Sequence, residues 1–194
     1  MKLVFATHNN NKLYEVKDLL SDSFEIFSLK DIGFFEEIIE DKKTIIENSK
    51  IKCMTVRQKT GYDCFADDTG LEVEALDGAP GVLSKRFAGL NASSDDNINK
   101  LLYLLKEKTN RNAQFKTVIS LNINGSLKTF EGICKGTIST KRMGESGFGY
   151  DPVFIPNGSK ISFGQMTIKE KNIIAHRSIA ISKLVNYLTN LYQF

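Results

Sequence analysis

The sequence has few of the residues that build disulfide frameworks, zinc sites and flexible linkers. Among 194 residues there are only three cysteines and three prolines. Cys53, Cys64 and Cys134 are widely spaced and form no Cys-x-x-Cys pair, which argues against a disulfide framework and a zinc site and predicts a reducing compartment. Because the chain also lacks internal repeats and Ser/Gly-rich tracts, we expect a single cooperative domain spanning residues 1–194.

Long apolar runs and blocks of like charge are missing as well. No segment reaches the length of a membrane span, and the apolar run after Lys2 is too short for a signal peptide. We therefore expect a cytoplasmic protein with no membrane partner. The formal net charge is +3 and the basic residues are scattered, so charge does not call for a nucleic-acid partner.

Strand-like and helix-like segments interleave along the chain. Thr44 and Glu47 form a capping box at the start of one predicted helix, and Asn124-Gly125 between two strand-like runs predicts a hairpin. We expect strands over residues 2–6, 63–66, 71–75, 117–123 and 127–133, and helices over residues 12–20, from 44 onward, 94–106 and 178–192. This interleaving predicts an α/β domain with a mixed sheet.

The loop at residues 7–12 joins a predicted strand to a predicted helix. Such a loop offers anions unpaired backbone N–H groups and the positive end of the helix dipole. Thr7 adds a hydroxyl, Asn9 an amide and Lys12 a positive charge, all of them suited to phosphate oxygens. A polar turn with an asparagine N-cap is the alternative, and the glycines of a Walker P-loop are absent.

Asp67 and Asp68 directly follow the apolar residues 64–66, which predicts that the pair lies at the end of a buried strand. Two adjacent carboxylates repel each other when both are dry and unpaired. Mg²⁺ would remove this conflict, because it binds one or two carboxylates together with phosphate oxygens. An acidic surface turn is the alternative. Residues 36–41 form a second acidic cluster, from which the residues alone select no ligand.

Helical spacing places Ile45, Ser49, Lys52 and Val56 on one face of the helix that begins near residue 44. A lysine on an inward face needs an anionic partner, such as a substrate, because a buried unpaired ammonium is costly. The alternative is a lysine whose stem lies along the helix edge while its ammonium reaches water.

A loop at residues 144–152 contains three glycines around Phe148 and Tyr150, followed by Asp151. Glycines let the backbone approach a ligand closely, aromatic rings stack on a base, and Asp151 can accept hydrogen bonds from a base edge. The alternative is a flexible surface loop.

Lys171, His176 and Arg177 place two cations and an imidazole just before the last predicted helix. Arg177 could donate two hydrogen bonds to a purine carbonyl or hold a phosphate. The alternative is a basic helix start, which the helix dipole disfavours.

Taken in order, these motifs resemble the inosine triphosphate pyrophosphatase family, and its bacterial XTP/dITP diphosphatases in particular. The matching segments cover nearly the full chain: Thr7-His8-Asn9-Asn10-Asn11-Lys12, Thr44-Ile45-Ile46-Glu47-Asn48 followed by Lys52, Phe65-Ala66-Asp67-Asp68-Thr69-Gly70-Leu71, Gly78-Ala79-Pro80-Gly81, Phe148-Gly149-Tyr150-Asp151-Pro152 and His176-Arg177. Departures are small: His8 and Asn11 stand where relatives often have glycine, and Ser146 replaces another glycine.

The resemblance implies a homodimer of two-lobed α/β subunits, with a long twisted mixed sheet flooring a central cleft. It also implies Mg²⁺-dependent hydrolysis of ITP, dITP and XTP to the monophosphate and pyrophosphate. By position, Glu40 and Asp68 would hold the metal, and Asp68 would activate water with Asp67 beside it. Lys12 and Lys52 would neutralise phosphate charge, and Thr69 would contact the substrate. The triphosphate would be bound by Thr7, His8, Asn9, Asn10, Asn11 and Lys12. The base would be recognised by Phe148, Gly149, Tyr150, Asp151, Lys171, His176 and Arg177.

Two other functions stay open. A pyrophosphatase of the related septum-associated type would act on pyrimidine or modified nucleotides, but such proteins begin with a Ser-x-Ser-Pro-Arg-like loop that residues 7–9 do not resemble. A nucleotide sensor or single-strand nucleic-acid binder could stack bases on Phe148 and Tyr150. A protein of that kind has no need of Asp67, Asp68 and Lys52 together.

Overall fold

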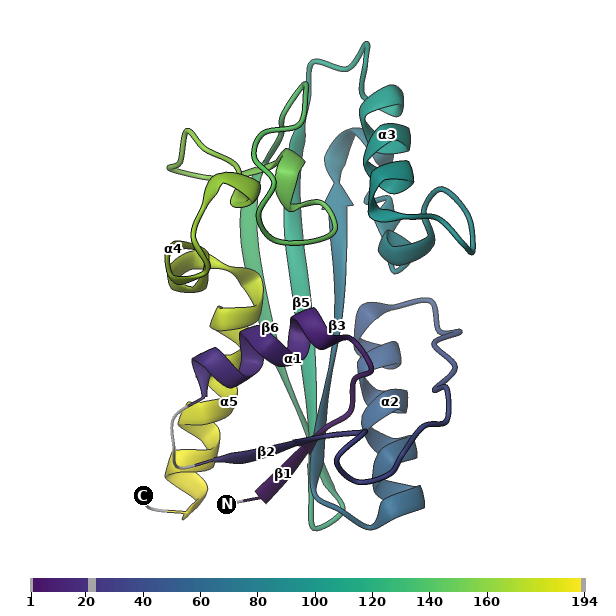
Figure 1. Ribbon diagram of the computed structural model, residues 1–194, viewed down its shortest axis with the longest axis vertical. Helices are drawn as coiled ribbons and strands as arrows, with labels where there is room; N and C mark the ends of the chain where they lie inside the picture. Colours follow the sequence, from purple (N-terminus) through teal and green to yellow (C-terminus); the bar gives the residue numbers. More distant parts are fainter. Residues whose placement is uncertain (1, 21–23, 193–194) are drawn as a thin grey trace. The chain divides into compact units, whose positions relative to one another are not determined.

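The structure is a computed structural model that describes residues 2–20 and 24–192. Within these residues the strands form a seven-stranded sheet of order β2-β1-β3-β5-β6-β7, with β4 paired to β3 (Figure 1). The strands are β1 (Lys2–Phe5), β2 (Glu25–Ser28), β3 (Cys64–Val73), β4 (Pro80–Gly81), β5 (Asn112–Ile123), β6 (Ser126–Ile138) and β7 (Phe154–Pro156). The helices are α1 (Asn10–Leu19), α2 (Ile45–Thr60), α3 (Ser94–Leu104), α4 (Ile168–Ile174) and α5 (His176–Tyr192). None of the helices in the described ranges has the length and apolar character needed to cross a membrane.

The sheet mixes parallel and antiparallel pairs. β1 lies parallel to both β2 and β3, whereas β4 is antiparallel to β3 and β7 is antiparallel to β6. The turn between β5 and β6 is the predicted Asn124-Gly125, in which both residues have positive φ, 49° and 79°, as a tight hairpin turn requires. The predicted α/β class with a mixed sheet is therefore confirmed.

The chain divides into two compact units. The first unit comprises Met1–Asp68, Thr117–Gly132 and Arg177–Phe194, and the second comprises Thr69–Lys116 and Ile133–His176. The boundaries fall inside β3, β5 and β6 and after the first residue of α5. Each unit has its own hydrophobic core. The single domain over residues 1–194 and the central cleft stay predictions.

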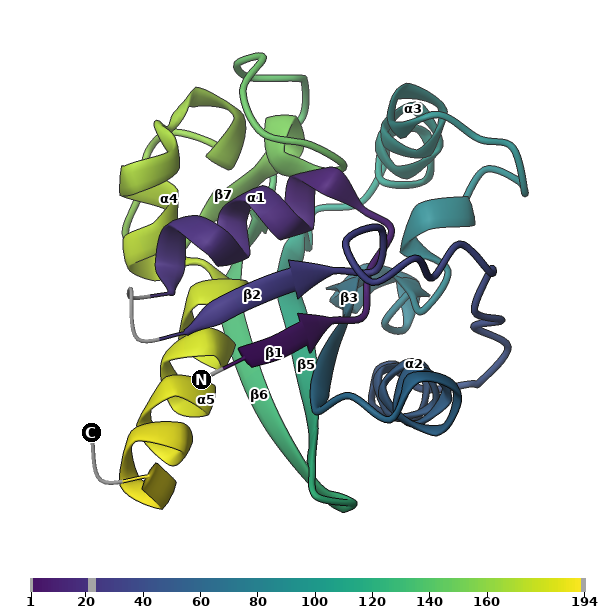
Figure 2. The same ribbon diagram turned by 60° about the horizontal axis from the view of Figure 1, so that its bottom comes forward.

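In the first unit, β1 is buried on both faces. Leu3 and Phe5 of β1 belong to a cluster that includes α1 and α5, whereas Val4 and Ala6 belong to a second cluster that includes α2. This split follows from the strand period of two, which sends successive side chains to opposite faces. Figures 1 and 2 accordingly show α1 and α5 on one side of β1 and α2 on the other.

In the second unit, one cluster joins α3 to the strands. Phe115 of β5 lies at its centre, with its ring centroid 4.7 Å from that of Phe154 and 6.2 Å from that of Phe163. Ile98 and Leu101 of α3 face this cluster, and both are buried. The cluster includes Tyr150, and its Phe115 stacks on His176, two of the residues that the resemblance assigns to base recognition.

Candidate active site

Asp67 and Asp68 lie in the middle of β3, with exposed fractions of 1% and 8%. The prediction of a strand end at this pair is wrong, because β3 continues to Val73. The predicted strand over residues 71–75 is the second half of β3, and its last residues form a 3-10 turn, Glu74–Leu76. Two buried carboxylates are stable in a strand only when a nearby cation balances the negative charge of each. Here Lys12 is paired with Asp67, and Lys52 is paired with Asp68.

Because Asp67 and Asp68 are consecutive on a strand, they point to opposite faces. Asp67 Oδ1 lies 2.9 Å from Lys12 Nζ of α1, and Asp68 Oδ1 lies 3.4 Å from Lys52 Nζ of α2. The two faces are the same ones that divide the hydrophobic clusters of the first unit. The repulsion expected between adjacent carboxylates is thus reduced by the strand itself.

On the Asp67 face, four charged groups form a chain of alternating sign. Lys12 donates to Asp67, Arg177 Nε lies 3.2 Å from the other oxygen of Asp67, and Arg177 also donates to Glu15 of α1. Burial alone would raise the pKa of Asp67, but attraction to Lys12 and Arg177 lowers it well below its usual range. Asp67 is therefore held ionised by its neighbours.

On the Asp68 face, one ammonium lies between two carboxylates. Lys52 Nζ is 2.9 Å from Glu40 Oε2 and 3.4 Å from Asp68 Oδ1. Burial raises the pKa of Asp68, and repulsion from Glu40 and Asp67 adds to the rise, against the opposing attraction to Lys52 and Lys12. The two adjacent aspartates therefore have pKa values shifted in opposite directions.

The helical face that holds Lys52 is buried as predicted. Ile45, Ser49 and Val56 are 5%, 0% and 0% exposed, and Lys52 is 6% exposed. Burial alone would lower the pKa of Lys52, but attraction to Asp68 and then to Glu40 raises it. The alternative of a lysine that extends into water is not what the structure shows.

The loop at residues 7–12 adopts a capped helix start. Asn9 is the N-cap of α1, and its Oδ1 accepts hydrogen bonds from the N–H groups of Asn11 and Lys12 at 3.0 and 3.3 Å. Thr7 Oγ1 accepts the N–H of Asn9 at 3.2 Å. The alternative of an asparagine N-cap is therefore present. Asn9, Asn10 and Asn11 are all exposed, and phosphate binding by this loop stays a prediction.

His8 contacts the acidic loop that precedes α2. Its Nε2 donates to the backbone carbonyl of Glu36 at 3.0 Å, and its ring stacks on Phe34 with centroids 6.5 Å apart. This contact links the loop at residues 7–12 to the segment that contains Glu40.

In the second unit, Asp151 organises the glycine-rich loop. Asp151 Oδ2 accepts hydrogen bonds from the N–H of Phe148 at 2.8 Å and from Lys171 Nζ at 2.7 Å. Lys171 Nζ also lies 4.9 Å from the centroid of the Phe148 ring, a cation–π contact. The structure thus brings together three residues that the resemblance assigns to the base.

Two glycines of this loop are required by packing within the protein. Gly147 has φ +78°, and a Cβ there would lie 2.1 Å from Asp151 Oδ2. A Cβ on Gly144 would lie 2.0 Å from the carbonyl oxygen of Gly164. Gly149 has φ +60° with nothing within 4 Å of its Cβ position, so open space is left beside the loop there.

The other residues assigned to the base lie in different surroundings. Tyr150 is buried and donates from its hydroxyl to the carbonyl of Ser84 at 2.9 Å, and burial raises its pKa. His176 is buried and stacks on Phe115 with centroids 4.5 Å apart. Arg177, by contrast, pairs within the first unit with residues of the Asp67 face. Thr69 is half-buried in β3.

Comparisons with known proteins identify the family of this chain. The Ham1 family model matches residues 3–187. The chain belongs to the Ham1 family. A "dITP/XTP pyrophosphatase" of Christiangramia forsetii is 53% identical over 189 residues, covering 97% of this chain and all of that protein. A protein of the same name from Flavobacterium psychrophilum is 52% identical over 190 residues, covering 98% and 100%.

Solved Ham1 structures share the fold of this Ham1-family chain. The Staphylococcus aureus Ham1 protein matches with a TM-score of 0.89 at 34% identity, and a HAM1 protein from Coxiella burnetii with 0.91 at 34% identity. Each match covers 98% of this chain and 99% of the other. The resemblance drawn from the motifs is therefore confirmed.

Glu15 is not among the predicted site residues, yet it pairs with Arg177 in the interior of the first unit. Glu15 is 5% exposed and directly precedes Val16, an inward residue of α1. The signal was present in the helical spacing, since Glu15 lies three residues after Lys12 and thus on a neighbouring part of the helix surface.

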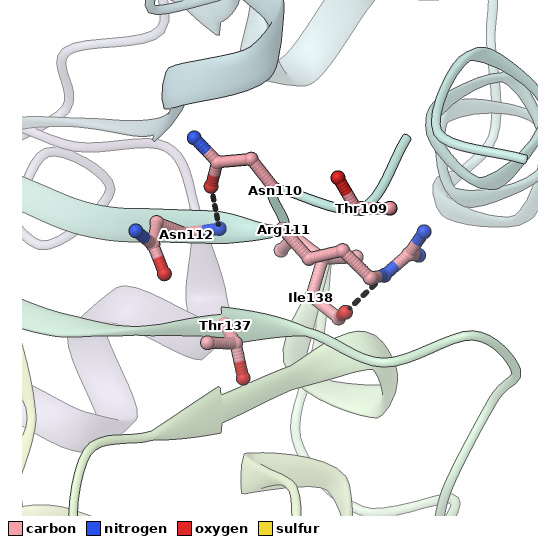
Figure 3. A pocket seen from close by; sticks show the side chains of 6 residues that line it. All are labelled: Thr109, Asn110, Arg111, Asn112, Thr137 and Ile138. Carbon is pink, nitrogen blue, oxygen red and sulfur yellow. Dashed lines mark hydrogen bonds between the residues drawn. The ribbon is translucent and has the colours of Figure 1, made fainter. Parts of the chain in front are cut away.

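A hollow of about 610 Å³ in the second unit contains none of the predicted site residues (Figure 3). It is lined by Thr109, Asn110, Arg111, Asn112, Thr137 and Ile138. Arg111 donates to the carbonyls of Ile138, Leu105 and Ser139 at 2.6, 2.7 and 2.6 Å. Its guanidinium therefore joins three backbone carbonyls of the second unit.

Proposed function

We propose that this protein hydrolyses non-standard purine nucleoside triphosphates, namely ITP, dITP and XTP, to the monophosphate and pyrophosphate. Such an activity removes these nucleotides from the precursor pool. The proposal is supported by membership of the Ham1 family and by relatives named dITP/XTP pyrophosphatase at more than 50% identity over their full length. The observation that carries it is the pair of neighbouring buried aspartates that each face a lysine, Asp67 with Lys12 Nζ at 2.9 Å and Asp68 with Lys52 Nζ at 3.4 Å.

The residues of the Asp68 face fit a magnesium ion. Mg²⁺ usually binds one or two carboxylates and completes its shell with phosphate oxygens and water. Among residues 2–20 and 24–192, no three His, Cys, Asp or Glu side chains form a group that could hold a metal. Asp68 and Glu40 already converge on a single cationic group, Lys52. When bound, Mg²⁺ would offset the charge of the triphosphate and of the leaving pyrophosphate.

Asp67 and Asp68 would then play different parts. Asp68, whose pKa is raised, is suited to accept a proton from the attacking water. Asp67, whose pKa is lowered, is suited to remain ionised and to orient Lys12. Lys12 and Lys52 would lower the barrier by neutralising phosphate charge as water attacks the α-phosphorus and pyrophosphate leaves.

Base recognition would rest on Phe148, Asp151 and Lys171. The Phe148 ring offers a face on which a purine can stack, and the buried Lys171 ammonium is a donor for a carbonyl at purine position 6. Adenine has an amino group at that position, so its entry would leave the donor without an acceptor, which is costly in a buried site. Arg177 would act mainly on Asp67, to which it is already bonded.

We also propose that the protein works as a cytoplasmic homodimer. The resemblance supports the dimer, and the three free cysteines fit a reducing compartment. Light scattering on the purified chain would test the dimer by its mass.

The function is tested by pyrophosphate release from ITP, dITP, XTP, GTP, ATP and UTP, each with Mg²⁺ and with a chelator. We expect release from the first three and only with Mg²⁺. Release from none of them would exclude the enzymatic function, and release mainly from UTP would favour the septum-associated type of pyrophosphatase. Release that the chelator does not reduce would exclude the metal.

A further inference from the structure

Asn48 binds both backbone groups of a single residue in the acidic loop. Its Oδ1 accepts the N–H of Lys42 at 2.9 Å, and its Nδ2 donates to the carbonyl of Lys42 at 3.3 Å. Asn48 is 1% exposed on α2. A buried side chain that satisfies both groups of one peptide residue fixes the path of the backbone at that point.

The segment that Asn48 holds has little other regular structure. Residues 34–43, all of them described, form neither helix nor strand. Phe34 and Ile38 anchor the start of the segment in the core, and Asn48 anchors its end at Lys42. Glu40 lies between these anchors, with its side chain 37% exposed. Because an irregular segment retains conformational freedom unless it is tied down, the direction of Glu40 depends on them.

The same helix holds the carboxylate of this segment. Lys52 lies four residues after Asn48 on α2, so the two side chains are neighbours on the helix surface. Asn48 fixes the backbone at Lys42, while Lys52 contacts the carboxylate of Glu40 at 2.9 Å. The two contacts together set both the position and the direction of Glu40 relative to Asp68.

We propose that Asn48 is a positioning residue that holds Glu40 ready to bind a divalent cation together with Asp68. The proposal rests on the metal-dependent function proposed above. Residues that orient metal ligands typically contribute 10- to 100-fold to metal affinity. Removing the Asn48 amide should leave the Lys42 backbone to water and let Glu40 turn away, so we expect about a tenfold weaker cation site.

The chain offers a matched control in Asn97 of α3. Asn97 is 4% exposed, accepts the N–H of Ala88 at 2.7 Å and donates to the carbonyl of Lys85 at 3.0 Å. It therefore ties a loop to a helix in the same manner as Asn48 does, but in the second unit and away from the acidic loop. Asn97→Ala removes an equivalent pair of hydrogen bonds without touching Glu40.

The test is a Mn²⁺ titration of the whole chain followed by electron paramagnetic resonance, which counts free ion without any turnover. We expect Asn48→Ala to weaken Mn²⁺ binding about tenfold and Asn97→Ala to leave it unchanged. In a Glu40→Ala background, Asn48→Ala should cause no further loss, because Asn48 acts through Glu40. Hydrogen exchange at the Lys42 amide should be faster in Asn48→Ala.

If Asn48→Ala does not fold, Asn48→Asp replaces it as the test variant. It keeps an acceptor for the Lys42 N–H and loses only the donor, and its added negative charge would by itself favour cation binding. Weaker Mn²⁺ binding in this variant would therefore isolate the lost hydrogen bond.

Unchanged Mn²⁺ affinity in Asn48→Ala, or stronger Mn²⁺ binding in Asn48→Asp, would overturn the positioning role, as would an equal loss in Asn97→Ala or a full additional loss in the Glu40→Ala background. Absence of Mn²⁺ binding by the unmodified chain would overturn it as well. If the unmodified chain binds Mn²⁺ but releases no pyrophosphate, the proposed function fails while the Mn²⁺ comparison still decides the role of Asn48.

Discussion

Arg177 Nε lies 3.2 Å from Asp67 Oδ2, although 110 residues separate the two in the chain. Both side chains are buried, and burial alone would lower the pKa of Arg177, but attraction to Asp67 and Glu15 raises it. This pairing makes the start of α5 part of the support for β3. It also divides the charged residues of the site into those that hold Asp67 and those that surround Asp68.

Removal of the Glu15 carboxylate charge should destabilise the first unit. Glu15→Gln leaves Arg177 buried beside one carboxylate in place of two, and breaking a buried ion pair typically costs 3–5 kcal/mol. Because glutamine can still accept a hydrogen bond, we expect a loss of about 2–3 kcal/mol in the free energy of unfolding by urea. Glu25→Gln is the control, since its pair with Lys2 is 3.8 Å long and exposed. Equal stability of both variants would contradict the buried network.

The two aspartates should respond differently to the same change. Asp68→Asn should reduce pyrophosphate release from ITP by at least about 10³-fold, with the fold intact, because the proposed proton acceptor and metal ligand would be lost. Asp67→Asn should instead lower stability, because Lys12 and Arg177 lose their shared buried counter-charge. Steady-state rates and thermal unfolding on both variants check this. Full activity in Asp68→Asn would remove that residue from the mechanism.

Lys171 should affect substrate binding more than turnover. In Lys171→Ala the cation over Phe148 and the partner of Asp151 are both lost, far along the chain from the aspartates that we propose carry the reaction. We expect KM for ITP to rise by more than kcat falls. Lys169→Ala, an exposed change on the same helix, is the control. An unchanged KM in Lys171→Ala would count against base recognition by this residue.

Gly147 should be intolerant of any side chain. Gly147→Ala combines a positive φ with a Cβ 2.1 Å from Asp151 Oδ2, whereas Gly158→Ala has a similar φ of +82° and nothing within 4 Å. We expect about 1 kcal/mol of destabilisation for Gly158→Ala, from backbone strain alone. Gly147→Ala should lose markedly more in chemical denaturation and also raise KM for ITP. Equal losses in the two variants would show that Asp151 moves freely.

Local spacing predicted part of this site. The 3.6-residue period placed Lys52 on the buried face of α2, and the capping box placed the start of that helix at Thr44. The buried face and the start of α2 both depend on residues within one or two helical turns of each other, so the local sequence is enough to predict them.

The remaining features depend on contacts between distant residues. β3 runs through Asp67 and Asp68 only because Lys12 and Arg177 compensate one and Lys52 compensates the other, which no local pattern shows. Tyr150 was expected to contact a base, and its place in the core depends on Ser84, 66 residues away. The glycines of the same loop were expected to favour ligand approach, whereas two of them pack against the protein itself.

The most direct test is ³¹P nuclear magnetic resonance of ITP mixed with the protein and Mg²⁺. The signals of the triphosphate should be replaced by those of inosine monophosphate and pyrophosphate, and this conversion should fail in Asp68→Asn and in the presence of a chelator. Appearance of inosine diphosphate with orthophosphate, or no conversion at all, would contradict the assignment.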